Sequence, residues 1–584
     1  MKAFLLKLKG FLHSFCTIVG ALTVICLIGL VVVGLFSSYP PTIEKNTYLT
    51  IDFSEPIIES DNAGILAELM DETPITFSKL LQSIEFAAAD NNITGIIAKI
   101  NTFSLTPAQA QDVARSLLVF KSTGKKTVVF SQGFGALGRG NIEYYLASFF
   151  DKIYMQPHTY IGLTGVSIEV PFLKNLLDKI GVSPEFYTRY EYKNAMASLT
   201  EAKMPKTYAE EMKSLGAALM AELKVDISEN RKLTETFENI VNKAPLTARE
   251  GQRLGLIDGT MYLPQLEKQL KDEGAEHFVN LQDYAATLSN NDGNLPTIAV
   301  LNLNGEIIDG KSKDNLSRDS AICSQDTVED IEDIKNLKQL KAVVVRIDSP
   351  GGSYNAADEI YFALKQLKEK TKVPLIISQS SYAASGGYFI SLAGDYIMAE
   401  PMTITGSIGV FGGKMVFEKL WKKLEINWGQ VTLGDNAGIL SPNHKFSTSE
   451  KKIFNQSLDE VYQDFTAKVA ENRKLTQPID KIARGRVWTG RQALNLGLVD
   501  AMGGYLEALS KAIELGKIKR NQNIRIVSFP KAKTLSEKIG DLIANTGSIK
   551  AEQLIEQSGV DITNLKLFKR LQYDTVMLPI KIDM

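Results

Sequence analysis

The chain has 584 residues, of which 44% are hydrophobic and 23% charged, and its formal net charge is −2. This length is too great for one ordinary core, so we expect two or more domains. The balanced charge, without a dense basic block, argues against nucleic acid as a partner. The 3 cysteines and 4 histidines have no ligand spacing, which argues against a disulfide framework and a metal site.

The N-terminal region has the pattern of a membrane anchor. Residues 1–10 carry three lysines, and residues 15–36 carry no charged side chain. A stretch of this length suits a helix that crosses a ~30 Å hydrocarbon core. The preceding lysines predict a cytoplasmic N-terminus, with the bulk of the chain outside. We expect an uncleaved anchor within residues 1–45; a cleaved signal peptide is the alternative, although residues 37–40 are a mediocre cleavage site.

From residue 46 the sequence indicates an α/β domain that extends to about residue 288. Apolar spacing predicts helices over residues 108–120 and roughly 208–231. Short apolar runs predict strands at residues 48–53, 96–100, 127–130 and 153–155.

This domain also contains the pattern Gly-x-Gly-x-x-Gly at residues 133–138. After a strand and before a helix, the pattern can cradle a dinucleotide. A dinucleotide site also needs an acidic residue about 20 residues further on. The expected strand there leads to Gln156, Pro157 and His158 instead. A glycine-rich turn is therefore the favoured interpretation.

A polar linker at residues 289–296 precedes a literal restart of the pattern. The sequence Glu-Asn-Arg-Lys-Leu-Thr at 229–234 recurs 242 residues later, and Leu-Gly-Leu-Ile-Asp at 254–258 recurs at the same offset with one Ile-to-Val change. Such long periods indicate duplication of a whole domain. We expect two domains of one fold, at 46–288 and 297–520. A C-terminal extension at 521–584 contains a candidate strand at 524–529 and no recognisable motif.

One stretch of the second domain has the properties of a nucleophile turn. An apolar strand at 375–377 is followed by small residues, by Ser385, Gly386 and Gly387, and then by an apolar helical pattern. A serine at a strand-to-helix turn lies near free backbone N–H groups, and the helix dipole there favours negative charge. A helix N-cap serine is the alternative interpretation.

The two halves differ at the positions that would carry this chemistry. Ser-Gly-Gly-Tyr at 385–388 aligns with Asn-Ile-Glu-Tyr at 141–144, so the serine occurs only in the second half. Gly351 and Gly352 follow a predicted strand and align with non-glycine residues of 99–105. Their N–H groups, with that of Gly386, could form an oxyanion hole worth about 2.7–4 kcal/mol per donor. A tight turn is the alternative for the glycine pair.

A serine nucleophile needs a base, and no histidine lies in a motif that suggests one. A lysine can serve if burial or a nearby positive charge lowers its pKa. Lys193 of the first half has aromatic and small neighbours, whereas the aligned residues 433–438 of the second half contain no lysine. This division predicts one composite site between the domains; a solvated surface lysine is the alternative.

At these residues the chain resembles the long, duplicated signal peptide peptidases A (protease IV type) of the S49 serine peptidase family. The resemblance covers about residues 10–520. It rests on Asp-Ser-Pro-Gly-Gly at 348–352, Ala-Ser-Gly-Gly-Tyr at 384–388, Thr-Gly-Ser-Ile-Gly at 405–409, Gly-Arg-Val-Trp-Thr-Gly at 485–490 and Tyr-Glu-Tyr-Lys at 190–193.

The resemblance implies a ClpP/crotonase-like fold of stacked β-β-α units in each domain. Ser385 would be the nucleophile, Lys193 the general base and Ser407 a hydroxyl that orients the lysine. The oxyanion would be held by backbone amides near Gly351, Gly352 and Gly386. No metal or cofactor is implied.

The resemblance also implies a homotetramer anchored by one helix in the bacterial inner membrane, with its catalytic domains on the periplasmic side. Its substrates would be remnants of cleaved signal peptides and other hydrophobic peptides. Two other functions stay open: an acyl-thioester enzyme on a crotonase-like fold, and a membrane scaffold without catalytic activity.

Overall fold

The computed structural model describes most of the chain beyond its N-terminal region. The described residues are 42–59, 74–101, 103–288, 294–312, 321–519 and 522–531, together with residue 20 and the strand Thr575–Met577. Apart from residue 20, the predicted anchor at 15–36 lies outside these residues. Among the described residues, no helix has both the length and the apolar character needed to cross a membrane.

The first half is built on a parallel sheet with the strand order β10-β6-β5-β4-β1-β11. Its strands are β1 (Thr47–Asp52), β4 (Ile93–Lys99), β5 (Lys126–Ser131), β6 (Lys152–Met155), β10 (Gly259–Thr260) and β11 (His277–Asn280). The four strands predicted from apolar runs are β1, β4, β5 and β6. Such short, continuously apolar strands are typical of parallel sheets with helices on their faces.

The remaining elements of the first half are mostly helices. They are α3 (Phe77–Ala89), α4 (Pro107–Ser122), α5 (Asn141–Ser148), α6 (Lys174–Ile180), α7 (Ala197–Thr200), α8 (Lys206–Asn230), α9 (Phe237–Lys243), α10 (Ala248–Arg253), α11 (Leu263–Asp272) and α12 (Leu281–Thr287). The short strands are β2 (Ile57–Ile58), β3 (Ile75–Thr76), β7 (Tyr160–Ile161), β8 (Ser183–Arg189) and β9 (Leu246–Thr247). A capping box between Thr106 and Gln109 fixes the start of α4.

The second half contains a larger sheet with the order β21-β19-β17-β15-β12-β23, to which β18 and β22 are added through β17. Its strands are β12 (Thr297–Asn304), β15 (Leu340–Ser349), β17 (Leu375–Ala384), β18 (Tyr396–Ala399), β19 (Ile404–Gly406), β21 (Val487–Thr489), β22 (Ala501–Met502) and β23 (Arg525–Phe529). A small sheet joins β14 (Ala321–Cys323), β13 (Glu306–Ile308), β16 (Gly351–Ser353) and β24 (Thr575–Met577). The remaining strand of this half, β20 (Val410–Val416), pairs antiparallel with β8 of the first half.

The helices of the second half follow the same alternation with strands as those of the first. They are α14 (Ser324–Lys335), α15 (Tyr354–Thr371), α16 (Gly386–Ser391), α17 (Glu418–Lys423), α18 (Thr448–Asn472), α19 (Ile479–Ile482), α20 (Gly490–Leu496) and α21 (Tyr505–Leu515). The long helices α8 and α18 both have 25 residues, and both end within the repeated sequence noted above. The alternation establishes an α/β fold in both halves.

One strand predicted within the C-terminal extension is part of the second sheet. β23 pairs in parallel with β12, just as β11 pairs in parallel with β1 in the first half. The strands β11 and β23 thus occupy equivalent edges of the two sheets.

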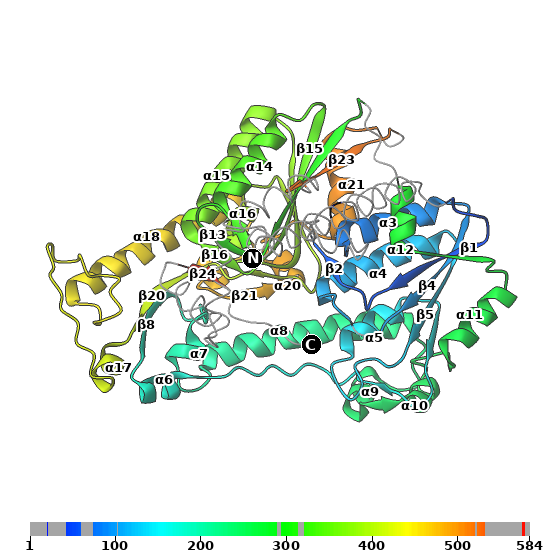
Figure 1. Ribbon diagram of the computed structural model, residues 1–584, viewed down its shortest axis with the longest axis horizontal. Helices are drawn as coiled ribbons and strands as arrows, with labels where there is room; N and C mark the ends of the chain where they lie inside the picture. Colours follow the sequence, from blue (N-terminus) through cyan, green and yellow to red (C-terminus); the bar gives the residue numbers. More distant parts are fainter. Residues whose placement is uncertain are drawn as a thin grey trace, which may run out of the picture.

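The halves pack on one another through a shared apolar core. Alternate residues of β15 face opposite sides of the second sheet: Val343 and Val345 belong to the core of that half, whereas Val344 lies in the cluster that contains Leu49 of the first half. The antiparallel ribbon of β8 and β20 adds a second connection. Figure 1 shows α8 along the base of the molecule, from the region of that ribbon to α5.

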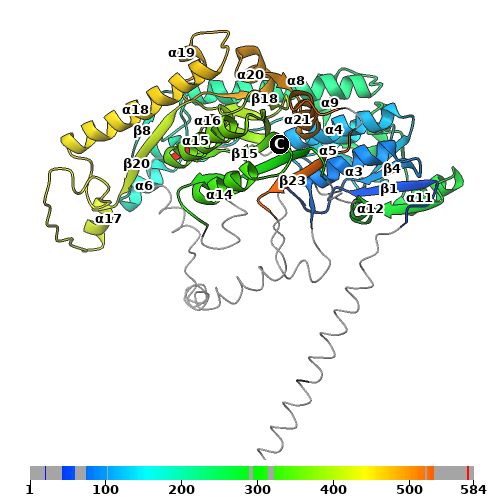
Figure 2. The same ribbon diagram turned by 90° about the horizontal axis from the view of Figure 1, so that it is seen from above.

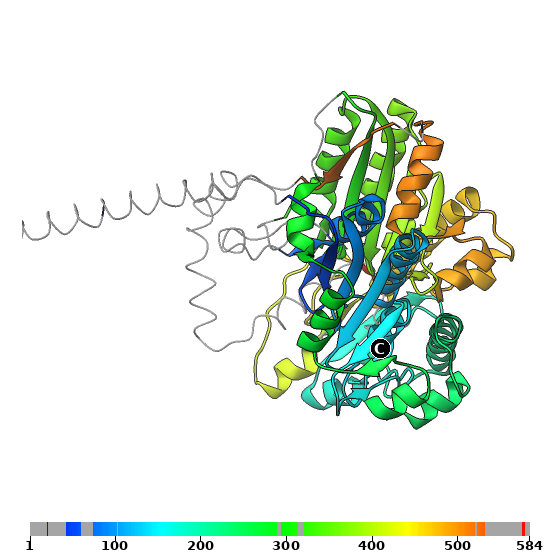
Figure 3. The same cartoon turned by 90° about the vertical axis from the view of Figure 1, so that its right-hand side faces the viewer.

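The other two views agree with this arrangement. In Figure 2 the ribbon of β8 and β20 lies at one end of the molecule and β1 at the opposite end. In Figure 3 the green strands of the second half lie above the blue and cyan elements of the first half. A site made from both halves therefore has to lie along the seam between them.

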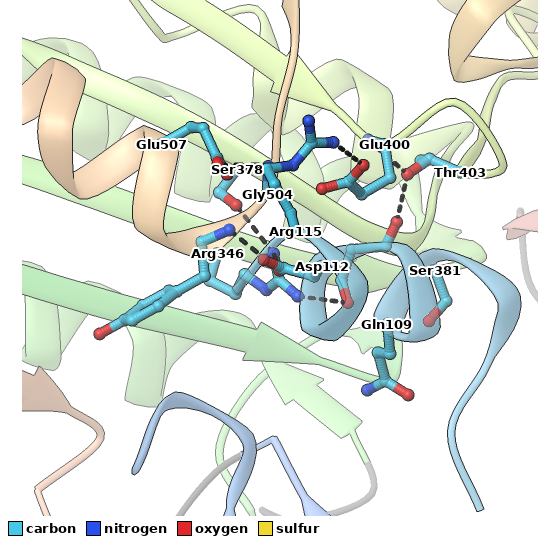
Figure 4. A network of polar contacts seen from close by, with 12 residues as sticks. Gln109, Asp112, Arg115, Arg346, Ser378, Ser381, Glu400, Thr403, Gly504 and Glu507 are labelled. Atoms are coloured by element: carbon cyan, nitrogen blue, oxygen red, sulfur yellow. Dashed lines mark hydrogen bonds and ion pairs between the residues drawn. The ribbon is translucent and has the colours of Figure 1, made fainter. Parts of the chain in front are cut away.

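A buried ionic network crosses that seam (Figure 4). Asp112 of α4 accepts a hydrogen bond from the Tyr505 N–H at the start of α21, at 3.0 Å, and its carboxylate lies 3.4 Å from the Arg346 guanidinium of β15. Arg115, one turn further along α4, pairs with Glu400 at 2.5 Å. Burial raises the pKa of Asp112 to about 6 and that of Glu400 to about 8.

The same network contains the acidic group that most resembles a metal site in the described part of the chain. Oxygen atoms of Asp112, Glu400 and Glu507 lie within 4.8 Å of one another. Arg115 already pairs with Glu400 and lies 3.4 Å from Glu507. A guanidinium thus provides the positive charge that a cation would otherwise supply, and we assign this cluster to the packing of the two halves.

Candidate active site

The nucleophile turn is a sharp change of direction between β17 and α16. Ser385 has φ 59° and ψ −116°, a backbone conformation that non-glycine residues adopt only when their surroundings hold it. Its N–H donates to the Gly406 carbonyl at 2.8 Å, and its carbonyl accepts from the Phe389 N–H at 2.9 Å. Ser385 stands at the N-cap position of α16, but its hydroxyl makes no capping hydrogen bond. The hydroxyl is thus available for another role.

Lys193 meets this serine from the first half. It lies just beyond β8 in a loop that contacts the second half, and its Nζ is 2.5 Å from Ser385 Oγ. The residue is only 3% exposed, so it is not a surface lysine. The structure therefore brings together the two residues that the sequence comparison of the halves singled out.

Burial determines the charge of this lysine. Removal from water lowers the pKa of Lys193 to about 7, while the Glu211 carboxylate opposes the shift. At neutral pH a large fraction of Lys193 is therefore a free amine that can accept a proton.

Glu211 of α8 is a member of the site that the sequence analysis did not identify. It accepts hydrogen bonds from the Val487 N–H at 2.8 Å and from Asn194 Nδ2 at 3.0 Å. Burial raises its own pKa to about 7. No local motif distinguishes it among 67 acidic residues; only the packing of α8 against β21 places it here.

Ser407 and Gly485 fix the position of the lysine. Lys193 Nζ donates to Ser407 Oγ at 3.0 Å and to the Ser407 carbonyl at 3.1 Å, and Ser407 Oγ donates to the Gly485 carbonyl at 3.3 Å. A Cβ atom on Gly485 would lie 2.5 Å from Lys193 N, so this close approach requires glycine. The sequence motifs at 405–409 and 485–490 thus meet at Lys193.

The glycine pair lies on the other side of the nucleophile. A Cβ atom on Gly386 would be 3.3 Å from Gly352 N, so the two backbones are adjacent. A Cβ atom on Gly352 would lie 2.0 Å from the Ile307 carbonyl oxygen, which excludes any larger residue there. The Gly351 N–H donates to Ser349 Oγ at 3.2 Å. The Gly351 N–H thus has a partner within the chain, and the oxyanion role of the three N–H groups stays a prediction.

The edge of β16 accepts an extended segment beside these groups. β24 pairs with it antiparallel, with Gly351 opposite Met577 and Gly352 opposite Val576. Strand addition of this kind is a common way to bind an extended peptide through its backbone. The site thus combines a serine hydroxyl, a buried lysine amine, backbone N–H groups and a strand edge, an arrangement that suits attack on a carbonyl group of a bound peptide.

The Gly-x-Gly-x-x-Gly pattern of the first half is explained by local packing. A Cβ atom on Gly135 would lie 2.3 Å from Gly140 N, and the Gly138 N–H donates to the Gly135 carbonyl at 2.9 Å. The glycines allow a tight turn before α5, as the favoured interpretation of the sequence expected.

The sequence is similar to known proteins over most of its length. The family model described as "Peptidase family S49" matches residues 119–276 and 367–519. "Serine protease SPPA, chloroplastic" of Arabidopsis thaliana is 30% identical over 490 residues, covering 81% of this chain and 70% of the relative. "Protease 4" of Haemophilus influenzae is 29% identical over 573 residues, covering 90% of each chain. "Protease 4" of Salmonella typhi is 30% identical over 460 residues, covering 76% and 72%.

A solved structure of a ClpP1 mutant from Listeria monocytogenes also matches. It covers 36% of this chain and 94% of its own, with 14% identity and a TM-score of 0.23. A likeness at this level decides nothing about the finer class of the α/β fold.

Proposed function

The chain belongs to peptidase family S49 and is a serine peptidase, and we propose that Ser385 and Lys193 are its catalytic dyad. The observation that carries the proposal is the 2.5 Å contact between Lys193 Nζ and Ser385 Oγ, made by a lysine that is buried and whose pKa is about 7. The acyl-thioester alternative has no role for such a pair.

The first step is a proton transfer. Neutral Lys193 takes the proton of Ser385 Oγ as that oxygen attacks the carbonyl carbon of the scissile peptide bond. Ser407 Oγ accepts a hydrogen bond from the amine and donates one to the Gly485 carbonyl, which restricts the position of the amine beside the hydroxyl. The resulting ammonium then protonates the leaving amine.

The oxyanion of the tetrahedral intermediate needs donors that are free when substrate arrives. We assign this role to the N–H groups of Gly352 and Gly386, because the two backbones lie next to each other beside Ser385. In the second stage neutral Lys193 activates a water molecule, which releases the acyl group from Ser385.

The substrates we propose are hydrophobic peptides, including the remnants of cleaved signal peptides. Buried apolar residues next to the nucleophile support this class: Ala384 packs in a cluster with Ile404, Val487 and Met212. The resemblance described from the sequence motifs points to the same class. Membrane attachment through residues 15–36, exposure on the periplasmic side, assembly into a homotetramer and a ClpP/crotonase-like form of each half belong to the same proposal.

The test is hydrolysis of a hydrophobic fluorogenic peptide by residues 46–584, beside the variants Ser385→Ala and Lys193→Ala. We expect turnover by the parent protein and none by either variant, with circular dichroism and thermal unfolding showing that both variants are folded. Equal turnover by the parent protein and Lys193→Ala would show that the base is another group. Turnover by Ser385→Ala would exclude the proposed nucleophile.

A further inference from the structure

A cavity of about 370 Å³ lies between the halves, where the residues of the first half that correspond to the active site of the second face Tyr382 and Ile404. Its wall includes Ser104, Leu105, Ile142 and Glu143. In the alignment of the halves these four residues are the counterparts of Gly351, Gly352, Gly386 and Gly387. The cavity is therefore the duplicated copy of the site around the nucleophile.

The residues proposed to carry the chemistry in the second half are replaced in the first half, although a cavity is present there. The counterpart of the nucleophile is Asn141, whose side chain is held by two hydrogen bonds with the Gly165 backbone, at 2.8 and 3.1 Å. Leu105 and Ile142 carry side chains where the other half has close-fitting glycines. A volume of about 300–1,000 Å³ is usual for sites that bind small ligands.

The cavity is continuous with the catalytic strand. Tyr382 and Ile404 line it and face each other across β17 and β19, two residues before the pair Ala384 and Gly406. Tyr382 precedes Ser385 by three residues, which corresponds to about 10 Å along a strand. Tyr382 and Ala384 also lie on the same face of β17, because side chains alternate along a strand.

The wall is suited to apolar side chains. Leu105, Ile142 and Ile404 are buried apolar residues, and Leu219 of α8 adds a fourth apolar contact. Glu143 is the acidic group of the wall. Arg139 is the basic group of the wall, and removal from water raises the pKa of Glu143 to about 7.

We propose that this cavity binds an apolar side chain of the same peptide that is cut at Ser385, at least about three residues from the scissile bond. The inference rests on the proposed function, since its occupant is the substrate of that site. The duplicated copy would then serve as a specificity site that selects long, apolar peptides over short ones.

The test uses Ser104→Trp, which places an indole at the mouth of the cavity. Ser104 is exposed, so the variant disturbs no buried packing. Ser122→Trp, at an exposed position at the other end of α4, is the matched control. Each protein is assayed with a short fluorogenic peptide that spans only the residues next to the cleaved bond. Two longer peptides are extended by leucines on the N-terminal or the C-terminal side.

We expect Ser104→Trp to raise KM about tenfold for one of the two extended peptides, equivalent to about 1.4 kcal/mol. The kcat for that peptide and both constants for the short peptide should stay within about twofold, a spread of less than about 0.5 kcal/mol. Ser122→Trp should match the parent protein throughout. An unchanged KM for both extended peptides, or equal losses on short and extended peptides, would overturn the inference.

Failure of the proposed peptidase function can be distinguished from failure of the proposal for the cavity. If the parent protein does not cleave the short peptide, binding of the fluorescein-labelled extended peptides to the Ser385→Ala protein, measured by anisotropy, decides the question instead. A Kd raised about tenfold by the added Ser104→Trp change supports the cavity as a peptide site, and an unchanged Kd excludes it.

Discussion

The low pKa of Lys193 predicts a particular dependence of the rate on pH. With a pKa of about 7, the neutral fraction is about 10% at pH 6, one half at pH 7 and about 90% at pH 8. We therefore expect kcat/KM to rise about tenfold from pH 6 to pH 8 and then to level off. An ordinary lysine, with a pKa of about 10.4, would give about a hundredfold rise over the same range and no plateau.

Removal of the Glu211 charge should change the pKa of Lys193 in a known direction. Because its charge raises the pKa of Lys193, Glu211→Gln should lower that pKa and move the midpoint of the profile to lower pH. The neighbouring Glu210→Gln is the matched control, since Glu210 is exposed on the same helix. Its profile should coincide with that of the parent protein.

The assay is initial-rate hydrolysis of a hydrophobic fluorogenic peptide at saturating and limiting concentrations, in buffers of constant ionic strength from pH 5.5 to 10. Protein incubated at each pH and returned to pH 8 must recover its full rate, which separates titration from unfolding. A flat profile between pH 6 and 9, or a rise that continues beyond pH 9, would refute the reasoning. A midpoint that does not move in Glu211→Gln would show that this carboxylate does not act on the lysine.

Three further predictions concern stability and access to the site. Lys193→Met should raise the free energy of unfolding at pH 7, by at most about 5 kcal/mol, because a pKa lowered from 10.5 to about 7 measures the cost of burying the amine; chemical denaturation checks this, and a less stable variant would contradict it. The pKa of Glu400 is raised from 4.5 to about 8 in the folded protein, so its contribution to stability is complete below about pH 4.5 and is lost as pH rises through about 8. Thermal unfolding temperatures should fall from pH 5 to pH 8, and Glu400→Gln should make that fall smaller. The largest change that one group can cause in the free energy of unfolding is about 1.4 kcal/mol per pH unit. An identical slope in both proteins would contradict this. A chain that ends at residue 531 lacks β24 on the β16 edge, so it should show a lower KM at unchanged kcat, and an unchanged KM would mean that this strand does not compete with substrate.

Much of the fold could be predicted from the sequence because the duplication supplied an internal control. The repeated Leu-Gly-Leu segments gave the alignment, and the differences between the halves then pointed to Ser385 and Lys193. Strands such as β4 and β5 were predictable because a strand buried on both faces needs a short, continuous apolar run.

Other parts of the site depend on tertiary packing and left no local signal. Glu211 lies on a long helix, and its distance from Lys193 is set by how α8 packs on β21. The partner of the Gly351 N–H is the Ser349 hydroxyl two residues earlier, a turn contact that the glycine pattern does not specify. The cavity beside Ile142 is a property of volume, which a sequence expresses only through many residues at once.

The position of the dyad in the chain also bears on when the enzyme becomes active during its synthesis. The two side chains are 192 residues apart, so at about 5–20 residues per second a ribosome would make the base roughly 10–40 s before the nucleophile. Until Ser385 has been made, the Lys193 amine has no serine hydroxyl from which to accept a proton. We therefore expect the proposed dyad to be complete only after the second half has been made and has docked on the first.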